Sequence, residues 1–463
     1  MENIVNENKI KDILTRTEKT ESKKINDIIS KSSELKGIDL EEVSYLLKVE
    51  NESDIQKILN QAKLIKQRIY GSRIVFFAPL YLSNECVNNC LYCGFRRDNK
   101  DLIRKTLKKE EIEEEVRTLE QQGHKRLLLV TSDSGKKTDI NFLEMAIRTV
   151  YETKSGKGEI RRININAPSM DLNDFKKLKA TGIGTYQLFQ ETYHRKIFEW
   201  VHPKGNKSNY EYHITTMDRA QKARIDDVGI GVLFGLYDYR FEVLALIQHS
   251  NHLEKEFGTG PHTVSVPRIE PAMNVLLSEN APYPVSDKNF AKLVAIIRIA
   301  LPYTGIILTT REKPELRNHL FEFGVSQISA GSRTSPGAYH VEKDRALKSA
   351  QFSLGDHRTL DEVIYEILKK GYFPSFCTAC YRKGRTGQDF MSLSKPGLIQ
   401  NFCTPNALFT FKEYLEDYAS KRTKIVGQKA INNYLKYASS QNIYKIIKEN
   451  LEKIEAGERD LYL

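Results

Sequence analysis

Three cysteines lie close together in the segment Cys86-Val-Asn-Asn-Cys90-Leu-Tyr-Cys93. Thiolates at the spacing C-x3-C-x2-C can hold three irons of a cubane 4Fe-4S cluster. No fourth cysteine stands nearby, so one iron would keep an open position that can bind a substrate or a cofactor. A zinc loop is the alternative, but zinc favours four closed ligands and the C-x2-C knuckle. The spacing therefore predicts a catalytic iron–sulfur cluster.

The other three cysteines form a second group towards the C-terminus. Cys377 and Cys380 are separated by two residues, and Cys403 follows after another 22. Taken alone, this spacing also fits a zinc site completed by a histidine. Beside a first iron–sulfur motif, a second iron–sulfur cluster is the better interpretation. Six cysteines in 463 residues are too few for a disulfide scaffold, so metal chemistry in a reducing compartment is expected.

The composition describes a globular enzyme-sized chain. Hydrophobic residues make up 40%, with 20 Phe and 23 Tyr, which is enough for a sizeable core and excludes wholesale disorder. The net charge of +11 comes from basic and acidic residues that interleave, which is typical of a solvated, lysine-rich surface rather than a nucleic-acid site. No apolar run approaches the roughly 20 residues of a membrane span, and the N-terminus has no signal-peptide pattern. We expect a cytoplasmic protein with no nucleic-acid or membrane partner.

The elements that must position these cysteines begin at residue 73. Eight short β-rich runs occupy residues 73–82, 126–132, 161–168, 185–193, 228–236, 263–269, 305–310 and 325–330. Amphipathic helical stretches lie between them, at 139–154, 171–182, 208–225, 238–256 and 286–301. Eight strands alternating with helices predict an α/β fold of the (β/α)8 TIM-barrel type. An open doubly wound sheet is the alternative, but no G-x-G-x-x-G turn follows the first strand.

Helical extensions are expected on both sides of this barrel. Residues 1–70 are charged, with apolar residues at threes and fours, and Gly37 and Asp39 are typical of a helix stop followed by a cap. Residues 361–463 are again mostly helical and hold the second cysteine group. The predicted division is an N-terminal helical extension (1–70), a barrel (71–360) and a C-terminal auxiliary cluster domain (361–463).

The first cysteine group directly follows the first strand, at the C-terminal face where barrel enzymes place their active sites. C-x3-C-x-aromatic-C at this place, with Tyr92 as the aromatic residue, resembles the radical S-adenosylmethionine (SAM) enzymes. The resemblance implies that the open iron chelates the amino and carboxylate groups of SAM. One electron then cleaves the sulfonium bond and yields a 5′-deoxyadenosyl radical.

Further SAM contacts are expected at two other strand ends. The second run ends in Thr-Ser-Asp-Ser-Gly, where many members of the superfamily carry a Gly-Gly-Glu-like segment for the SAM amino group. The residue types differ here, and Ser132 and Asp133 are the candidates for the SAM contact. The fifth run contains three glycines, of which Gly231 is the candidate for a close backbone approach to the adenine. Relief of crowding inside the barrel explains these glycines equally well.

The two cysteine groups together resemble the HydG family, the tyrosine lyases of iron–iron hydrogenase maturation. The resemblance covers nearly the whole chain and includes the stretches TYQLFQETYH, TVSVPRIEPA and ISAGSRTSPG. The related thiamine-pathway enzyme, 2-iminoacetate synthase (ThiH), shares the barrel and the first triplet but lacks the C-terminal triplet. The second triplet therefore separates the two interpretations.

The resemblance implies a defined chemistry. The adenosyl radical abstracts hydrogen from the amino group of L-tyrosine, and the Cα–Cβ bond breaks to give p-cresol and dehydroglycine. Dehydroglycine is then converted to carbon monoxide and cyanide. The second, auxiliary cluster with an extra iron builds an iron–carbonyl–cyanide unit bearing cysteine for the hydrogenase H-cluster. An electron donor and other hydrogenase maturation proteins are the implied partners.

Candidates for substrate binding follow the fourth and eighth runs. Arg333 can clamp a carboxylate with two hydrogen bonds, and Ser329 and Ser332 can add more. A purely structural loop is the alternative. In the fourth run, Gln187, Gln190 and Glu191 are interspersed with apolar residues, and polar residues at the end of a barrel strand are typical of a barrel site; Gln190 and Glu191 are the candidates. Glu191 is a candidate for SAM or for the substrate amine, and both options stay open.

His262 differs from the other histidines by its position. It stands just before the sixth run, on the face opposite to the first cysteine group. If the C-terminal helices bring the second cysteine triplet under that face, His262 becomes a candidate ligand of the extra iron, a role that the family match in this stretch supports. Two sites roughly 20 Å apart would need a passage through the barrel for small intermediates. The alternative is a structural histidine whose hydrogen bonds are satisfied at the start of the strand.

The main interpretation therefore has two rivals. One is the thiamine-pathway lyase, which stops at dehydroglycine. The other is a non-catalytic iron–sulfur carrier, which has no need of an open iron beside an eight-stranded barrel. The oligomeric state and the docking partners are not encoded in any pattern that we find.

Overall fold

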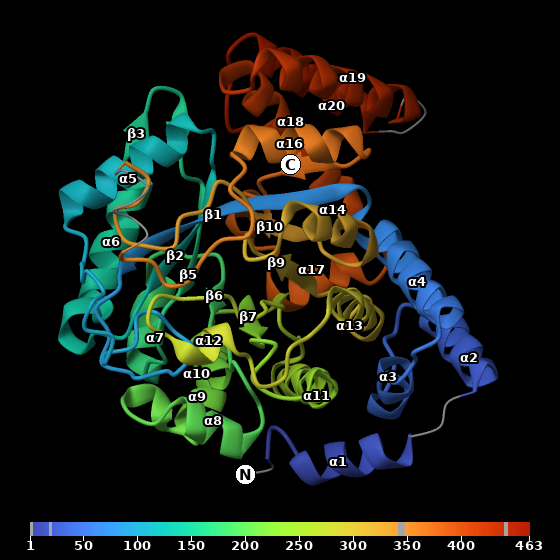
Figure 1. Ribbon diagram of the computed structural model, residues 1–463. Helices are drawn as coiled ribbons and strands as arrows, with labels where there is room; N and C mark the ends of the chain where they lie inside the picture. The colour runs from blue at the N-terminus through green and yellow to red at the C-terminus, as the bar shows by residue number, and fades with distance from the viewer. Residues whose placement is uncertain (1–2, 18–20, 341–347, 439–442) are drawn as a thin grey trace.

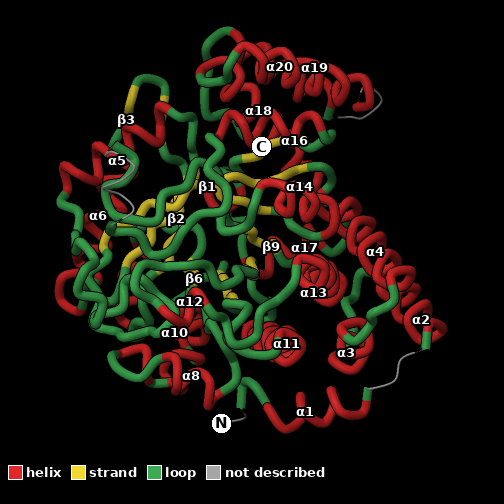
Figure 2. The backbone as a smooth tube through the Cα atoms, in the orientation of Figure 1, coloured by secondary structure: helices red, strands yellow, loops and turns green. Residues whose placement is uncertain are grey.

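The computed structural model describes residues 3–17, 21–340, 348–438 and 443–463. Within them, eight strands form a closed ring in chain order, and the last pairs with the first. Every neighbouring pair in the ring is parallel, which confirms the (β/α)8 barrel. Figure 2 shows the strands in yellow with the helices in red around them. The strands are β1 (Arg73–Ser83), β2 (Arg126–Thr131), β5 (Arg162–Asn166), β6 (Tyr186–Gln187), β7 (Val228–Gly231), β8 (Thr263–Ser265), β9 (Gly305–Leu308) and β10 (Gln327–Ser329).

Amphipathic helices connect these strands and cover the barrel (Figure 1). The longer ones are α5 (Lys109–Gln121), α6 (Ile140–Glu152), α7 (Leu172–Ala180), α8 (Arg195–Val201), α10 (Thr216–Lys222), α11 (Tyr239–Phe257), α13 (Asp287–Ala300) and α14 (Pro314–Phe323). Short polar side chains start several of them: Asp139 accepts from the third residue of α6, and Ser286 does the same for α13. The expected alternation of strand and helix is thus present, although most strands are shorter than the β-rich runs.

The fourth run shows why the strands are shorter. Only Tyr186 and Gln187 are paired as β6, although the β-rich run extends to residue 193. Glu191 has a left-handed backbone, with φ at +68°. A bulky residue in that region breaks a regular strand. The chain therefore turns here, and the Glu191 side chain leaves the strand near the C-terminal mouth of the barrel.

The N-terminal helices form a layer on the outside of the barrel. They are α1 (Glu7–Arg16), α2 (Ser22–Ser32), α3 (Leu40–Leu47) and α4 (Glu52–Tyr70), and they pack against α11, α13 and α14. Asp39 and Glu42 form the capping box that starts α3, as the Gly37 and Asp39 pattern suggested. The buried ammonium of Lys292 on α13 donates to the carbonyls of Leu47 and Val49 at 3.0 and 2.8 Å, which fastens this layer.

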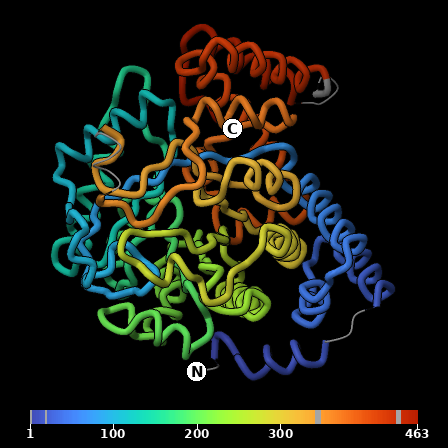
Figure 3. Tube along the Cα trace, in the orientation of Figure 1, coloured from blue at the N-terminus to red at the C-terminus, as the bar shows by residue number. Residues whose placement is uncertain are grey.

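The C-terminal segment gathers at another side of the barrel, where Figure 3 shows it in orange and red. It contains α16 (Leu360–Lys369), β11 (Phe373–Ser375), α17 (Gly387–Ser394), α18 (Gln400–Asp417), α19 (Lys421–Ala438) and α20 (Tyr444–Glu455). The strand β11 was not expected. It pairs in parallel with the first residues of β1, at the N-terminal end of the barrel. Pro374 is compatible with this position because β11 is an edge strand.

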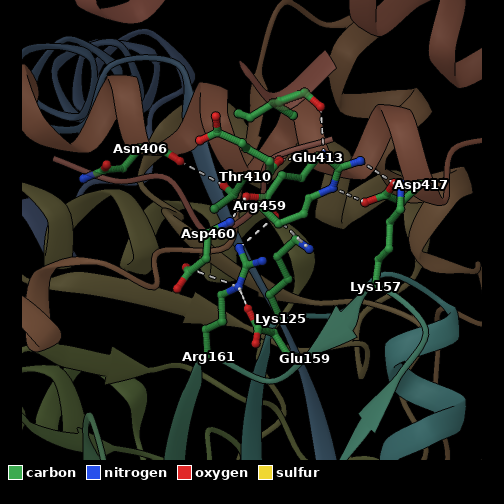
Figure 4. A network of polar contacts seen from close by, with 12 residues as sticks. Lys125, Lys157, Glu159, Arg161, Asn406, Thr410, Glu413, Asp417, Arg459 and Asp460 are labelled. Carbon is green, nitrogen blue, oxygen red and sulfur yellow. Dashed lines mark hydrogen bonds and ion pairs between the residues drawn. The ribbon is translucent and has the colours of Figure 1, made fainter. Parts of the chain in front are cut away.

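Buried charges fix α18 to the base of the barrel (Figure 4). The Glu413 carboxylate lies 2.7 Å from Arg161 Nη1 and 3.1 Å from Lys125 Nζ, and all three side chains are almost fully buried. Arg161 directly precedes β5, and Lys125 directly precedes β2. Since ionic groups taken out of water need close partners, this network holds the C-terminal helices at one place on the barrel.

The barrel interior is filled in layers of different polarity. Phe77, Leu128 and Ile307 form an apolar cluster of their own. Towards the N-terminal mouth, Arg126 Nη2 donates to Gln327 Oε1 at 2.8 Å.

None of the helices in the described ranges is long and apolar enough to cross a membrane.

Candidate active site

The first cysteine group lies in the loop after β1, at the C-terminal end of the strands. Cys86, Cys90 and Cys93 border a cavity of about 220 Å³ and are free thiols. Burial raises the pKa of all three, that of Cys86 to about 11. Buried thiols that resist ionisation alone become good thiolate ligands when a cation replaces their protons. This donor set fits an iron–sulfur cluster.

Neither cysteine group is arranged for a single metal ion. In the part of the chain that the structure describes, no three His, Cys, Asp or Glu side chains converge closely enough to share one ion. A cubane needs no such convergence, because each of its irons takes one thiolate.

Ser132 and Asp133 border the same cavity and also hold the cysteine loop. The Asp133 carbonyl accepts from Val87 N at 2.7 Å, and its carboxylate accepts from the Asn88 amide at 3.1 Å. Ser132 donates to the carbonyl of Glu85. Both predicted residues thus lie beside the cluster loop, and several of their hydrogen-bonding groups hold that loop in place.

Tyr92 anchors the loop on its other side. Its hydroxyl lies 2.8 Å from His202 Nε2, and His202 Nδ1 donates to the carbonyl of Phe198 at 2.9 Å. Burial holds the pKa of His202 well below its usual value, so the neutral ring accepts from Tyr92. The aromatic residue of the motif therefore ties the cysteines to the helix α8.

Glu191 points into the cavity and forms an ion pair with Lys207 at 2.8 Å. Burial lowers the pKa of Lys207, but the nearby Glu191 and cysteine charges outweigh it, and the pKa is raised. The site thus contains a charged lysine that the sequence did not reveal, because Lys207 lies in a short 3-10 turn (Asn206–Ser208) without a motif. By contrast, Gln190 does not border the cavity, and no protein atom in the described residues accepts from its buried amide nitrogen.

Gly231 also lies outside this cavity. A Cβ at this glycine would stand 2.7 Å from the ring of Phe189. The missing side chain therefore makes room for Phe189 inside the barrel. This placement agrees with the crowding explanation rather than with an adenine contact.

The loop after β10 places its predicted residues in different ways. Ser329 and Ser332 border the cavity, and the buried Ser332 hydroxyl has no partner within the described chain. Ser329 Oγ accepts from Thr310 N at 3.1 Å. Arg333 does not border the cavity: its guanidinium donates to the Ser332 carbonyl at 3.1 Å. In this arrangement Arg333 does not face the cavity, and its role as the carboxylate clamp stays a prediction.

Arg311 is the arginine that reaches the cavity instead. It follows β9, and its guanidinium stacks on the ring of Phe352 at 3.3 Å from the ring centre. Burial lowers the pKa of Arg311. A partly buried cation with a planar face held by an aromatic ring is prepared to bind a carboxylate. The segment Thr-Thr-Arg directly after a strand was the available signal, since strand ends carry barrel active sites.

The second cysteine group lies at the opposite mouth of the barrel. Cys377, Cys403 and His262 border a cavity of about 50 Å³. A hydrogen bond from Cys380 lowers the pKa of Cys403 to about 6, while the same contact raises the pKa of Cys380. The three thiols and the histidine predicted from the sequence are thus brought together, and their chemistry fits an iron–sulfur cluster with a nitrogen ligand for a further iron.

The walls of the two cavities approach each other inside the barrel. On β1, Val75 borders the second cavity and Phe77 the first; on β10, Gln327 borders the second and Ser329 the first. Two residues of a strand rise only about 7 Å. The residues that border the two cavities are therefore close together along these two strands.

Comparisons with known proteins agree with this geometry. The family description Radical SAM superfamily matches residues 80–248, and Biotin and Thiamin Synthesis associated domain matches residues 265–373. The 2-iminoacetate synthase of Salmonella typhimurium is 29% identical over 321 residues, which is 69% of this chain and 82% of the relative.

Two solved structures resemble nearly the whole chain. The first, a HydG described as a maturase of the FeFe-hydrogenase, has a TM-score of 0.96 and 51% identity, and covers 99% of this chain and 100% of its own. The second, the FeFe-hydrogenase maturase HydG from Carboxydothermus hydrogenoformans, has a TM-score of 0.84 and 41% identity, with 97% of each chain covered.

Proposed function

The chain belongs to the HydG family of FeFe-hydrogenase maturases within the radical SAM superfamily, and we propose that it cleaves L-tyrosine and builds an iron–carbonyl–cyanide unit. One observation carries the proposal. The two cysteine triplets lie at opposite mouths of one barrel, and on β1 and β10 the residues that border the two cavities are only two positions apart. A simple lyase needs only the first site, whereas coupled synthesis needs both.

At the first site, Cys86, Cys90 and Cys93 would hold a 4Fe-4S cluster whose open iron takes SAM. When bound and reduced by one electron, this pair supplies a 5′-deoxyadenosyl radical that abstracts hydrogen from the tyrosine amino group. Ser132 and Asp133 fix the loop and border the SAM position. The remaining task of the protein is to hold tyrosine so that its amino group faces that position.

Arg311 is the proposed clamp for the tyrosine carboxylate, and Ser332 offers a hydroxyl that borders the same cavity. A guanidinium binds a carboxylate through two parallel hydrogen bonds, which fixes the amino acid in direction as well as position. Glu191 can accept from the substrate amine or from SAM while Lys207 balances its charge. Cleavage of the Cα–Cβ bond would then leave p-cresol and dehydroglycine.

At the second site, Cys377, Cys380 and Cys403 would hold the auxiliary cluster, and His262 would bind the extra iron, which is part of the product. Dehydroglycine would reach this site through the barrel and yield carbon monoxide and cyanide. Arg126 supports such a route: it is fully buried beside Gln327, and its Nε and Nη1 have no partner among the described residues. Two buried donors on a cation can form hydrogen bonds with an anion that passes through the barrel. Cysteine would complete the product.

The test is anaerobic reconstitution with iron, sulfide, SAM, tyrosine and dithionite. We expect 5′-deoxyadenosine, p-cresol, carbon monoxide and cyanide to appear together, and to depend on tyrosine. The curated relatives favour one second candidate, the 2-iminoacetate synthase reaction. In that case p-cresol forms while carbon monoxide and cyanide do not. A carrier would form none of these products.

A further inference from the structure

One amide side chain joins the first cysteine loop to a distant part of the chain. Gln351 Nε2 donates to Cys93 Sγ across 3.5 Å, and Gln351 Oε1 accepts from the Tyr81 hydroxyl at 2.8 Å. A cluster-bound thiolate can only accept a hydrogen bond, so the amide must turn its N–H towards the sulfur. Tyr81 then donates to the oxygen at the other end of the amide. The two contacts therefore fix one orientation.

The backbone of Gln351 is held as firmly as its side chain. Its carbonyl accepts from Gly94 N at 3.0 Å, and its own N–H donates to the Thr334 carbonyl at 2.9 Å. A Cβ on Gly94 would stand 2.6 Å from that carbonyl oxygen, so only glycine permits this approach directly after Cys93. The strand end at β1, the cysteine loop and the loop after β10 are thus locked around one hydrogen bond to sulfur.

Tyr81 buries one end of this arrangement, while Cys93 and Gln351 are partly buried at the edge of the cavity. Tyr81 is 5% exposed, and its ring packs edge-on against Phe95 at 5.9 Å between ring centres. Burial raises the pKa of Tyr81, so its hydroxyl stays protonated and keeps donating. In a medium of low dielectric constant, a hydrogen bond to an anionic sulfur is stronger than it is in water.

We propose that Gln351 is a positioning residue that raises the reduction potential of the SAM-binding cluster through its N–H···S bond to Cys93, with Tyr81 holding the amide in the donating orientation. The reduced cluster carries one more negative charge than the oxidised cluster. A donor aimed at a cluster sulfur stabilises that charge, and hydrogen bonds to the sulfurs are among the features that set such potentials. The inference rests on the proposed function, because it requires the cluster to be held by Cys86, Cys90 and Cys93.

The experiment is a redox titration, followed by electron paramagnetic resonance, of the full chain with both clusters reconstituted. Gln351→Leu removes the donor, Gln351→Glu replaces it with a carboxylate, and Tyr81→Phe frees the amide to turn. Gln56→Leu on α4, whose exposed amide donates to Glu52 one turn earlier on the same helix, is the matched control. Iron, sulfide and SAM binding are measured in each variant.

At a fixed potential, we expect Gln351→Leu to lower the ratio of reduced to oxidised first cluster about tenfold, which is about 59 mV for a one-electron couple. Gln351→Glu should lower this ratio more than Gln351→Leu does, and Tyr81→Phe should lower it less. Gln56→Leu should leave the ratio unchanged. The second cluster should keep its potential in every variant. After exchange into D2O, pulsed resonance on the wild type should detect a deuteron coupled to the first cluster that Gln351→Leu lacks.

An unchanged potential in a Gln351→Leu protein with full iron content and SAM binding would overturn the inference and leave the proposed function standing. If that variant does not assemble its cluster, the wild-type deuteron signal and the Tyr81→Phe titration decide. Absence of the deuteron coupling, or an unshifted Tyr81→Phe potential, then counts against Gln351. A wild type that forms no reducible cluster on these cysteines would instead refute the proposed function.

Discussion

The imidazole of His262 faces the carboxylate of Asp227, with 3.5 Å between Nδ1 and Oδ1. The carboxylate is itself fixed, because it accepts from Gly387 N at 3.2 Å and lies 3.6 Å from Arg162 Nη2. A metal-bound histidine commonly donates its second N–H to such a carboxylate, which orients the ring. Asp227 therefore leaves Nε2 of His262 available to an iron in the second cavity.

Asp227→Asn should weaken binding of the extra iron about 10- to 100-fold, as loss of an orienting partner does in other metal sites. His262→Ala should have the larger effect, with the cubane on the three cysteines retained in both. Iron counting and resonance spectra of the reduced proteins measure this. Asp226→Asn, at a neighbouring residue that is 44% exposed, is the control. If Asp227→Asn keeps the full iron count and wild-type spectrum, the carboxylate does not orient the ligand.

Arg311→Lys should raise the apparent KM for tyrosine about tenfold or more. A lysine keeps the charge but cannot make two parallel hydrogen bonds or stack on Phe352, and the loss of about 1.4 kcal/mol is a factor of ten in binding. Initial rates of p-cresol release over a range of tyrosine concentrations measure it. The comparison is Arg333→Lys, which lies outside the cavity and should leave KM near the wild-type value. The reverse pattern would restore Arg333 as the clamp.

These two arginines show where the sequence stops being informative. Both directly follow a strand end, so the barrel pattern nominates both. Which of them enters the cavity depends on the path of each loop: Arg333 turns back onto the carbonyl of Ser332, whereas Arg311 rests on Phe352. No spacing rule encodes that choice. Lys207 was missed for the same reason, since it lies in a loop that only the folded barrel brings to the site.

The barrel and the two cysteine groups were predicted from local sequence patterns. The barrel follows from alternation of β-rich and amphipathic runs, and the cysteines from spacing within short segments. The edge strand β11 was missed because three residues containing Pro374 resemble a turn between helices rather than a strand. Only the exposed edge at the start of β1 makes a strand of that segment.

Glu413→Gln should destabilise the attachment of the C-terminal helices. The change leaves Lys125 and Arg161 buried without their shared carboxylate, and such a loss costs about 3–5 kcal/mol. Calorimetry should show a lower transition temperature. Glu159→Gln removes a partly exposed partner of the same arginine and should cost less than about 1 kcal/mol. Equal transition temperatures in wild type and Glu413→Gln would mean that the network does not hold α18.

Cys90→Ala should abolish all tyrosine cleavage, because the first cluster loses one of its three protein ligands. Release of p-cresol and 5′-deoxyadenosine, normalised to iron content, measures the loss. The second cluster, with its own cysteines, should still assemble and give its resonance signal. Wild-type p-cresol output from a variant with verified cluster content would contradict the assignment of this triplet.

Cys377→Ser separates the two chemistries. Tyrosine cleavage uses the barrel, SAM and the first cluster, so this variant should still release p-cresol, although more slowly. Cys377 borders the second cavity beside His262, and Arg162 Nη1 contacts its sulfur at 3.6 Å. A serine hydroxyl is a poor substitute for a thiolate on iron, so the auxiliary cluster should be lost or incomplete. Carbon monoxide and the ability to mature hydrogenase should fall with it.

Simultaneous assay of p-cresol, carbon monoxide and hydrogenase activation tests the separation, with Cys90→Ala as the variant that loses all three. If Cys377→Ser makes carbon monoxide and active product at wild-type rates, the second triplet is structural, and these products form without an auxiliary cluster on it.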